Sequence, residues 1–345
     1  MNDIRGKSTA CLLAGALGDA LGYEVEFLSW PSIQARFGKN GIRQLSLEGG
    51  KARFSDDTQM TLFTAEGLCL ARERGEDPLL GVYNAYLCWL RTQGGNADTP
   101  YAPLSALLSL PEMNRLRAPG NTCLSALNSG FMGLLEPPIN HSKGCGGVMR
   151  TAPCGLVGRG EPFGNPLLLG ARAAAVTHGH PLGWIPAGML ADLVDRCLSG
   201  AYTSLRELTE DSLSATVGAF ADRKEIGVFE ALIRRAMELA EQPVLSPRET
   251  AAVDEPAIRS LGGGWVGEEA LAIALYAALR YEKDLKAALI AAVNHGGDSD
   301  STGAICGNIL GAWLGMEAIP PDWAEQLELR EEIEALARRL YDLRA

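Results

Sequence analysis

The strongest constraint on the fold is a regular spacing of small residues in two segments at opposite ends of the chain. One segment has a glycine at every fourth position: Gly303, Gly307, Gly311 and Gly315. The other has small residues at the same spacing: Ala14, Gly18 and Gly22. Glycine costs a helix about 1 kcal/mol relative to alanine, so its repetition on one helical face predicts close approach of a neighbouring backbone. We expect two central, tightly packed helices, each a candidate partner for the other.

The rest of the chain also favours helix. Alanine and leucine are abundant, alternating β-branched runs are nearly absent, and 47% of the 345 residues are hydrophobic. Predicted helices cover about 8–22, 57–75, 79–93, 120–133, 164–178, 182–199, 225–241, 267–282, 284–294, 301–316 and 323–342. Gly/Pro-rich connections are predicted at 23–55, 94–118, 134–153 and 242–266. We expect an all-α fold with a single domain over 1–345, and we interpret 242–262 as a surface loop rather than a domain boundary.

Composition excludes several classes of protein. The net charge of -11 and the lack of a Lys/Arg-rich run argue against nucleic acid as a partner. No apolar run reaches transmembrane length, and Asp19 interrupts the apolar N-terminal segment, which we therefore interpret as a helix of the mature fold. The eight cysteines form no CxxC pair, and the four histidines lack zinc-ligand spacing. These features predict a cytoplasmic protein with reduced, mostly buried thiols.

Two acidic clusters carry the clearest chemical signal. The first is Ser55-Asp56-Asp57-Thr58, and the second runs from Asp298 to Thr302 after Gly296-Gly297. Both precede predicted helices, so helix capping is the alternative interpretation. Capping needs one such residue, however, and each cluster has two carboxylates among hydroxyls. Carboxylate and hydroxyl oxygens are hard ligands, and four aspartates in one pocket cannot all stay ionised without cations. Together the clusters predict a site for two divalent cations, Mg²⁺ or Mn²⁺, suited to hydrolysis.

Other motifs carry weaker signals. Asp19, inside an apolar helix, predicts either a metal ligand or a buried network that holds the ligands. Glu26 lies in the following loop, where an exposed side chain or one that reaches a metal is compatible with the sequence. The glycine-rich segment 144–150 lacks the Lys-Ser/Thr of a nucleotide P-loop, yet its amides suit a pyrophosphate. His178 fits a helix cap, and Trp265 fits either a stacking platform or the core.

The order of these motifs resembles that of the ADP-ribosylglycohydrolase family. The segments that carry the resemblance are GDALGYEVEF at 18–27, SDDTQM at 55–60, GGVMRTAP at 146–153, the Thr177-His178 pair and GGDSDSTGAICGNILGA at 296–312. They span roughly residues 8–316. The resemblance implies a compact all-α fold with a dinuclear Mg²⁺ or Mn²⁺ centre in a central cleft.

The resemblance also implies roles for individual residues. The metal ligands would be Ser55, Asp56, Asp57, Asp298, Asp300 and Ser301. The family often has threonine where this chain has Ser55 and Ser301, and the hydroxyl is retained. The residues lining the ADP-ribose cleft would be Gly146, Gly147, Val148, Met149, His178 and Trp265. The catalytic residues would be Asp57, Asp300 and Glu26, with Glu26 in a loop that gates the metals.

These features lead to one main expectation and several alternatives. We expect a metal-dependent hydrolase that removes ADP-ribose from a modified protein, with arginine as the favoured linkage. Serine, acetyl ester and nucleobase linkages are alternatives. So are an immunity-type protein that neutralises a cognate ADP-ribosyltransferase by occlusion, and a phosphohydrolase or nucleotide hydrolase. The motif order disfavours the last of these.

Overall fold

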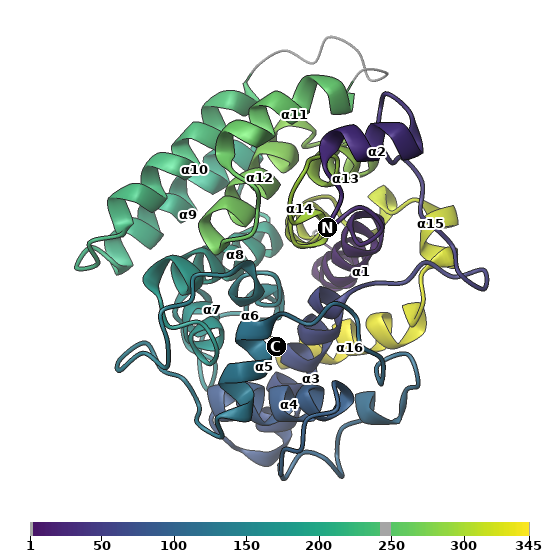
Figure 1. Cartoon of the computed structure of the whole chain (residues 1–345). Helices are drawn as coiled ribbons and strands as arrows, with labels where there is room; N and C mark the ends of the chain where they lie inside the picture. Colours follow the sequence, from purple (N-terminus) through teal and green to yellow (C-terminus); the bar gives the residue numbers. More distant parts are fainter. Residues whose placement is uncertain (1–2, 242–249, 345) are drawn as a thin grey trace.

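Helices form the ordered framework of the part of the chain that the structure, a computed structural model, describes: residues 3–241 and 250–344 (Figure 1). Within these residues the α-helices are α1 (Ile4–Gly22), α2 (Trp30–Phe37), α3 (Asp56–Arg74), α4 (Pro78–Thr92), α5 (Asn121–Asn128), α6 (Ala152–Leu156), α7 (Pro166–Ala175), α8 (Pro181–Ser199), α9 (Leu205–Ala219), α10 (Ile226–Ala240), α11 (Thr250–Leu261), α12 (Gly267–Arg280), α13 (Leu285–Val293), α14 (Ser299–Leu314), α15 (Pro321–Gln326) and α16 (Arg330–Leu343). Three short 3₁₀ turns are η1 (Leu107–Ser109), η2 (Cys145–Gly147) and η3 (Met316–Ala318). β-Structure in the described residues is limited to isolated bridges, which confirms the all-α prediction.

Polar side chains at the N-caps set where several helices begin. The Asp77 carboxylate accepts hydrogen bonds from the first amides of α4, and Asn165 and Asp284 do the same for α7 and α13. Each satisfies an amide that has no partner inside its own helix. These helices then bury their apolar faces in one continuous hydrophobic core.

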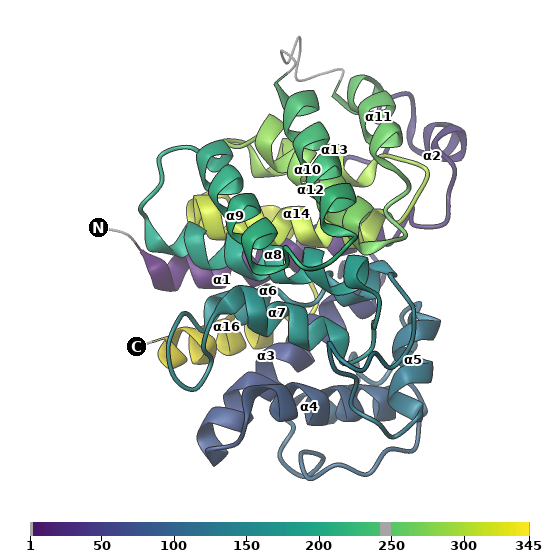
Figure 2. The same ribbon diagram turned by 90° about the vertical axis from the view of Figure 1, so that its left-hand side faces the viewer.

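The two helices with regularly spaced small residues pack against each other at the centre of the molecule, as predicted. Figures 1 and 2 show α1 and α14 side by side in both views. A Cβ on Gly18 would lie 2.0 Å from the carbonyl oxygen of Gly303, and a Cβ on Gly307 would lie 2.0 Å from that of Ala14. Both distances are far inside van der Waals contact. Glycine is therefore required here for close backbone approach.

The same device joins two further helix pairs that the sequence pattern did not reveal. A Cβ on Gly67 of α3 would lie 2.7 Å from the carbonyl oxygen of Gly81 in α4. A Cβ on Gly170 of α7 would lie 2.7 Å from that of Ala187 in α8. In Figure 2, α3 and α4 lie below α1, whereas α9 to α13 lie above it. The α1–α14 pair thus lies between these two groups of helices.

Several sequence-based boundaries were wrong. Residues 242–266 were expected to be a connection, but α11 occupies Thr250–Leu261; residues 242–249 lie outside the described part of the chain. Asp254 anchors α11 because its carboxylate accepts hydrogen bonds from Tyr276 and Tyr281, at 2.7 Å each. Helices α2, α6 and α9 were also missed. They are short or rich in polar residues, so their apolar periodicity is weak.

The predicted C-terminal helix over 323–342 is interrupted, which corrects the sequence-based boundary. Leu329 has a φ of 49° and separates α15 from α16. Just before it, the Glu328 carboxylate forms an ion pair with Arg117 at 2.9 Å and accepts a hydrogen bond from the Phe54 amide at 3.1 Å. The break lets Glu328 brace the segment that leads into the first acidic cluster.

The prediction that most of the thiols are buried is confirmed. All eight cysteines are free, and seven are buried. Cys145 is the partly exposed one. Within the described residues no helix has both the length and the apolar character to cross a bilayer.

Candidate metal centre and substrate cleft

The first acidic cluster lies at the N-terminus of α3, where α1 holds it. The Asp19 carboxylate accepts hydrogen bonds from the Ser55 amide at 2.8 Å, the Thr58 amide at 2.9 Å and the Thr58 hydroxyl at 2.5 Å. Ser55 is the N-cap, and its hydroxyl oxygen accepts from the Asp57 amide at 3.2 Å. Of the two roles considered for Asp19, these bonds support a buried network that positions the cluster.

The second cluster lies at the N-terminus of α14, where Asp298 is the N-cap. The Asp298 carboxylate accepts a hydrogen bond from the Ser301 amide, and the Asp298 amide donates to the Gly263 carbonyl at 2.8 Å. A Cβ on Gly297 would lie 1.9 Å from that same carbonyl oxygen. The glycine before Asp298 therefore allows the 262–266 segment to approach and fix the start of α14.

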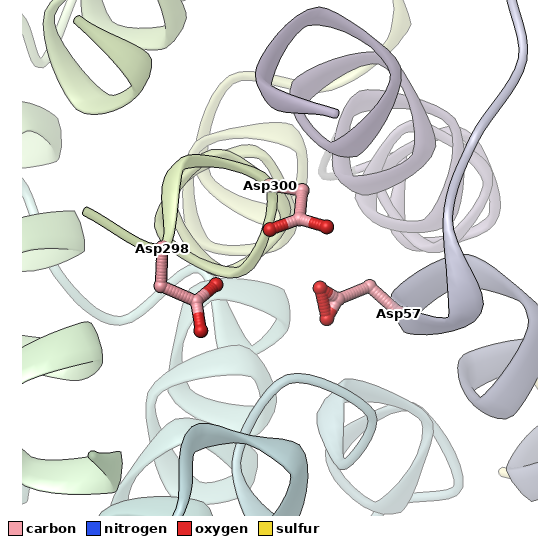
Figure 3. Close-up of side chains that lie close together, drawn as sticks. All are labelled: Asp57, Asp298 and Asp300. Atoms are coloured by element: carbon pink, nitrogen blue, oxygen red, sulfur yellow. The ribbon is translucent and has the colours of Figure 1, made fainter. Parts of the chain in front are cut away.

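The structure brings the two clusters together. Asp57, Asp298 and Asp300 each offer a carboxylate oxygen, and these oxygens lie within 4.8 Å of one another. Figure 3 shows the three side chains pointing toward a common space between α3 and α14. The Ser301 hydroxyl bridges the helices by donating to the Asp57 carboxylate at 3.0 Å. Asp56 lies beside them and accepts from the Gly120 amide at 3.3 Å.

The electrostatics of this cluster are unfavourable without a cation. Burial and the nearby charge of Asp300 raise the pKa of Asp57 and of Asp56 well above the usual range. Burial and Asp298 do the same for the pKa of Asp300. None of the described residues that line the surrounding cleft is a lysine or an arginine. Divalent cations would supply the missing positive charge, and the oxygen-only donor set suits Mg²⁺ or Mn²⁺.

Glu26 reaches the same cluster from the loop after α1. Its side chain is 8% exposed, and its Oε2 is buried without a hydrogen-bond partner. Burial, followed by repulsion from Asp300 and Asp298, raises the pKa of Glu26 to about 10. Of the two positions compatible with the sequence, the structure places Glu26 at the cluster rather than on the surface. A partnerless oxygen facing carboxylates is a second feature that fits a cation.

A cleft of about 370 Å³ opens from the carboxylates to solvent. Two aromatic rings lie at its border: Phe27, which follows Glu26, and Trp265. The rings stack with centroids 5.9 Å apart and an interplanar angle of 22°, and Phe27 remains 72% exposed. Trp265 therefore forms part of a cleft wall, as one of its two interpretations required.

The glycine-rich segment forms a floor beside the carboxylates. Gly146 and Met149 line the cleft, as expected for substrate-binding residues. Gly147 and Val148 do not, because the η2 turn directs them into the interior, where Val148 is fully buried. Cys145 lies at the metal side, with its Sγ 2.8 Å from Asp298 Oδ2. Ser55 also lies behind the cleft lining, as the α3 cap.

His178 borders the cleft next to this floor. Its Nδ1 lies 2.8 Å from the Thr177 hydroxyl oxygen, and the side chain is 1% exposed. Burial, with a smaller contribution from Arg150, lowers the pKa of His178 well below its usual value. The ring is therefore a neutral polar group at neutral pH.

Sequence reasoning missed part of the cleft wall. The wall includes the segment at the start of α5, residues 118–123, together with Phe27 and Cys145. Phe27 and Cys145 are adjacent to residues that were singled out, so their positions in the motifs were the available signal. The segment 118–123 shows no chemical pattern in the sequence. Its role depends on the amide of Gly120 reaching Asp56 across the fold.

A larger hollow elsewhere lacks this chemistry. It has a volume of about 690 Å³ and lies behind the end of α1. Its acids are paired: Glu24 forms an ion pair with Arg36, and Glu48 with Arg53. Paired surface acids have no need of a metal, so cavity size alone does not identify the site.

Comparison with known proteins agrees with the geometry. The family model described as ADP-ribosylglycohydrolase matches residues 1–345, and the chain belongs to this family. The chain is 25% identical to the ADP-ribosyl-[dinitrogen reductase] glycohydrolase of Rhodospirillum rubrum over 342 residues, covering 96% of this chain and 93% of that protein. It is 28% identical to mouse ADP-ribosylhydrolase ARH3 over 219 residues, covering 58% of this chain and only 57% of ARH3.

A solved structure extends the likeness to the fold. The chain is similar to an "ADP-ribosylglycohydrolase-related protein complex", with a TM-score of 0.67, 27% identity and full coverage of both chains. The order of motifs in the sequence therefore identified the family correctly.

Proposed function

We propose that this protein is a divalent-metal-dependent hydrolase that removes ADP-ribose from modified protein side chains, with arginine as the favoured linkage. The observation that carries the proposal is the cluster of buried carboxylates in an open cleft whose described lining residues include no lysine or arginine. We also propose that residues 1–345 act as one domain and that two cations, Mg²⁺ or Mn²⁺, occupy the cluster.

The proposed ligands follow from position. Asp57, Asp298 and Asp300 would hold the cations, with Asp56 beside them and Ser301 hydrogen-bonded to Asp57. Ser55 would act through the position of the α3 N-terminus, since its hydroxyl accepts the Asp57 amide. When bound, divalent cations would polarise the distal ribose hydroxyls and lower the pKa of a water molecule.

The hydrolysis breaks the bond between the anomeric carbon and the side-chain nitrogen. Water adds its oxygen to the anomeric carbon, one of its protons passes to a carboxylate, and the departing nitrogen gains a proton. Asp57 or Asp300 would accept the proton, because both carboxylates lie in the cluster. Glu26 would orient the attacking water through its partnerless Oε2. The acidic cleft also favours a cationic guanidinium as the leaving group.

The remaining cleft would hold the rest of ADP-ribose. Gly146, Met149 and His178 line the floor, and Trp265 with Phe27 offers an aromatic surface on which a base or sugar can stack. Gly147 and Val148 would support this floor from below. We further propose that the physiological partner is an ADP-ribosylated protein, with a cognate ADP-ribosyltransferase as a second partner.

The test is release of free ADP-ribose from an arginine-ADP-ribosylated protein, with Mg²⁺ or Mn²⁺ and then with EDTA. We expect metal-dependent release by the wild type, and release slower by roughly a thousandfold or more by Asp300→Asn. Asp77→Asn is the matched control, because asparagine caps a helix as well as aspartate and Asp77 caps α4 away from the cleft. Release of phosphate or AMP instead would reject the proposed reaction. Release from serine-linked but not arginine-linked protein would reject the linkage alone.

A further inference from the structure

A buried arginine lies behind the cleft without a carboxylate partner among the described residues. Arg150 is fully buried, and its guanidinium lies over the ring of Tyr86 at 4.4 Å. Its hydrogen-bond acceptors are the Met60 and Cys123 sulfurs, the Ala173 carbonyl and the Thr177 hydroxyl. A buried charge that is not offset by an acid is costly, so this arrangement calls for a functional reason.

The contact with Thr177 fixes the direction of a hydrogen bond. A guanidinium can only donate, so the Thr177 oxygen accepts from Arg150 Nη2 at 2.6 Å. The hydroxyl proton must then point elsewhere. His178 Nδ1 lies 2.8 Å from the same oxygen, and an imidazole nitrogen is a better acceptor than the Cys123 sulfur, which already accepts from Arg150 at 3.2 Å.

This direction determines which ring nitrogen of His178 carries the proton. If Nδ1 accepts from Thr177, a neutral ring carries its proton on Nε2. A proton on Nδ1 would instead point toward the Thr177 oxygen, which already accepts a hydrogen bond from the positively charged guanidinium of Arg150. A doubly protonated ring is disfavoured as well, because burial and Arg150 lower the pKa of His178.

The Nε2 edge of the ring faces the glycine-rich floor of the cleft. A Cβ on Gly144 would lie 3.3 Å from Nε2, and a Cβ on Gly146 would lie 3.4 Å from it. Because Gly144 and Gly146 have no side chains, they leave the Nε2 edge of the His178 ring uncovered at the start of the cleft. His178 itself lines the cleft.

We infer that Thr177, held by Arg150, is a positioning residue that fixes His178 as the Nε2–H tautomer, and that this N–H donates to the diphosphate of the bound ligand. This N–H would add a side-chain donor to the backbone amides of the glycine-rich floor, in a cleft that no lysine or arginine lines among the described residues. The tautomer is a property of the free protein. Only the assignment of the ligand group rests on the proposed function.

The tautomer can be read directly by two-bond ¹H–¹⁵N correlation in protein labelled with ¹⁵N-histidine. The chain has only four histidines, and the signal lost in His178→Gln assigns the residue. Two variants of Thr177 form a matched pair: Thr177→Val removes the hydroxyl at nearly constant volume, whereas Thr177→Ser keeps it. Thermal melting of both variants checks that the fold is retained.

We expect the wild type and Thr177→Ser to show the proton on Nε2 and a hydrogen-bonded Nδ1. In Thr177→Val the Nδ1 signal should move to that of an unbonded ring nitrogen. A wild-type proton on Nδ1, or an unchanged spectrum in Thr177→Val, would overturn the inference. If Thr177→Val does not fold, the wild-type tautomer and the Thr177→Ser spectrum still decide it.

Binding of ADP-ribose in the presence of Mg²⁺ tests the ligand contact. The Kd should rise about tenfold in Thr177→Val and stay near the wild-type value in Thr177→Ser, because a hydrogen bond to a charged acceptor is lost only in the first. ADP should show the same tenfold rise, since it contains the diphosphate, whereas adenosine should show none. An equal loss for adenosine would reject the diphosphate contact. Failure of the wild type to bind ADP-ribose, with the tautomer as expected, would reject the proposed function but not the positioning role.

Discussion

Two buried acidic sites in this protein are built in opposite ways. At the first, which we term the Asp254 site, the carboxylate of α11 forms a 2.7 Å ion pair with Arg280 and accepts hydrogen bonds from two tyrosines. At the second, the proposed metal site of Asp57, Asp298 and Asp300, which we term the metal cluster, the acids face one another in a cleft with no lysine or arginine among its described lining residues. At the Asp254 site the carboxylate charge is balanced by a residue of the chain itself, whereas the described residues that line the cleft do not balance the charges of the metal cluster.

The difference separates structural from functional acids. A buried charge is tolerated when a partner and hydrogen bonds compensate it, as at the Asp254 site. The metal cluster keeps its charges close together at a cost in stability, and it lies beside an opening. Burial alone therefore does not mark a functional acid. What distinguishes the metal cluster is the lack of a lysine or an arginine among its described lining residues, and this lack is the basis for proposing an external cation.

The largest expected effect is on turnover. Asp300→Asn should lower the rate of ADP-ribose release by roughly a thousandfold or more, because the loss of a ligand removes several kcal/mol of charge stabilisation. In EDTA the same variant should melt at a higher temperature than the wild type, since one repelling charge is gone. Initial rates and scanning calorimetry on the same sample measure both. A lower melting temperature for Asp300→Asn than for the wild type in EDTA would show that other groups of the protein already compensate the charge of Asp300.

Asp254→Asn should show the reverse pattern. It removes the negative charge that forms the buried ion pair with Arg280, whose side chain is 2% exposed, so the free energy of unfolding should fall by about 3–5 kcal/mol. The rate per folded molecule should stay unchanged at a temperature where the variant is folded. Denaturant titration gives the stability. A thousandfold loss of rate in the folded variant would break the distinction between the two sites.

Divalent cations should stabilise the wild type more than Asp300→Asn. At a Mg²⁺ concentration of one hundred times Kd the gain in unfolding free energy is about 2.7 kcal/mol.

The pH dependence of the melting temperature tests the same carboxylates. The folded pKa values of Asp19 (about 7) and Glu26 (about 10) lie above their unfolded values, so protonation favours the folded state.

In EDTA the melting temperature should therefore rise as the pH falls from 8 to 5.5. With saturating Mg²⁺ this trend should reverse, because protons then compete with the cation for the carboxylates. Melting curves at both pH values, with EDTA and with Mg²⁺, decide the matter. The same pH trend in both conditions would show that the cation does not bind these carboxylates.

The smallest expected effect comes from the helix packing that holds the metal cluster. Gly307→Ala should cost about 1–3 kcal/mol of unfolding free energy, because the new methyl group meets the Ala14 carbonyl oxygen at 2.0 Å. It should also weaken Mg²⁺ binding, since α1 carries Asp19 and α14 carries Asp300. Gly218→Ala in α9 is the control, because nothing lies within 4 Å of its added Cβ. Equal stability of both variants would mean that α1 and α14 can separate at little cost.

The features that the sequence predicted are those with a local signature. The four-residue spacing from Gly303 to Gly315 predicted the central helix pair, and the two aspartates in each acidic cluster predicted the metal cluster. The uninterrupted C-terminal helix and the loop at 242–266 were mispredicted. The C-terminal helix is interrupted at Leu329, next to Glu328, which forms an ion pair with Arg117. Helix α11 forms although it contains Pro256, and Asp254 fixes it to α12 through the hydrogen bond from Tyr276. Both outcomes depend on partners distant in sequence.

The candidate site shows the same division. Asp57, Asp298 and Asp300, which the structure brings together, are among the six metal ligands predicted from the two acidic clusters and the family resemblance. For Asp19 the sequence left two roles open, a metal ligand or a buried network, because its contacts with Ser55 and Thr58 depend on the packing of α1. Nor does the sequence distinguish Met149, which lines the cleft, from its neighbour Val148, which is buried in the core.

The central claim is that the three aspartates form an incomplete site that external cations complete. The most direct measurement is Mn²⁺ binding to the metal-stripped protein, followed by electron paramagnetic resonance and calorimetry, for the wild type, Asp300→Asn and Asp254→Asn. We predict two Mn²⁺ ions per chain in the wild type and in folded Asp254→Asn, and fewer in Asp300→Asn. Absence of binding in the wild type, or full binding in Asp300→Asn, would contradict the account.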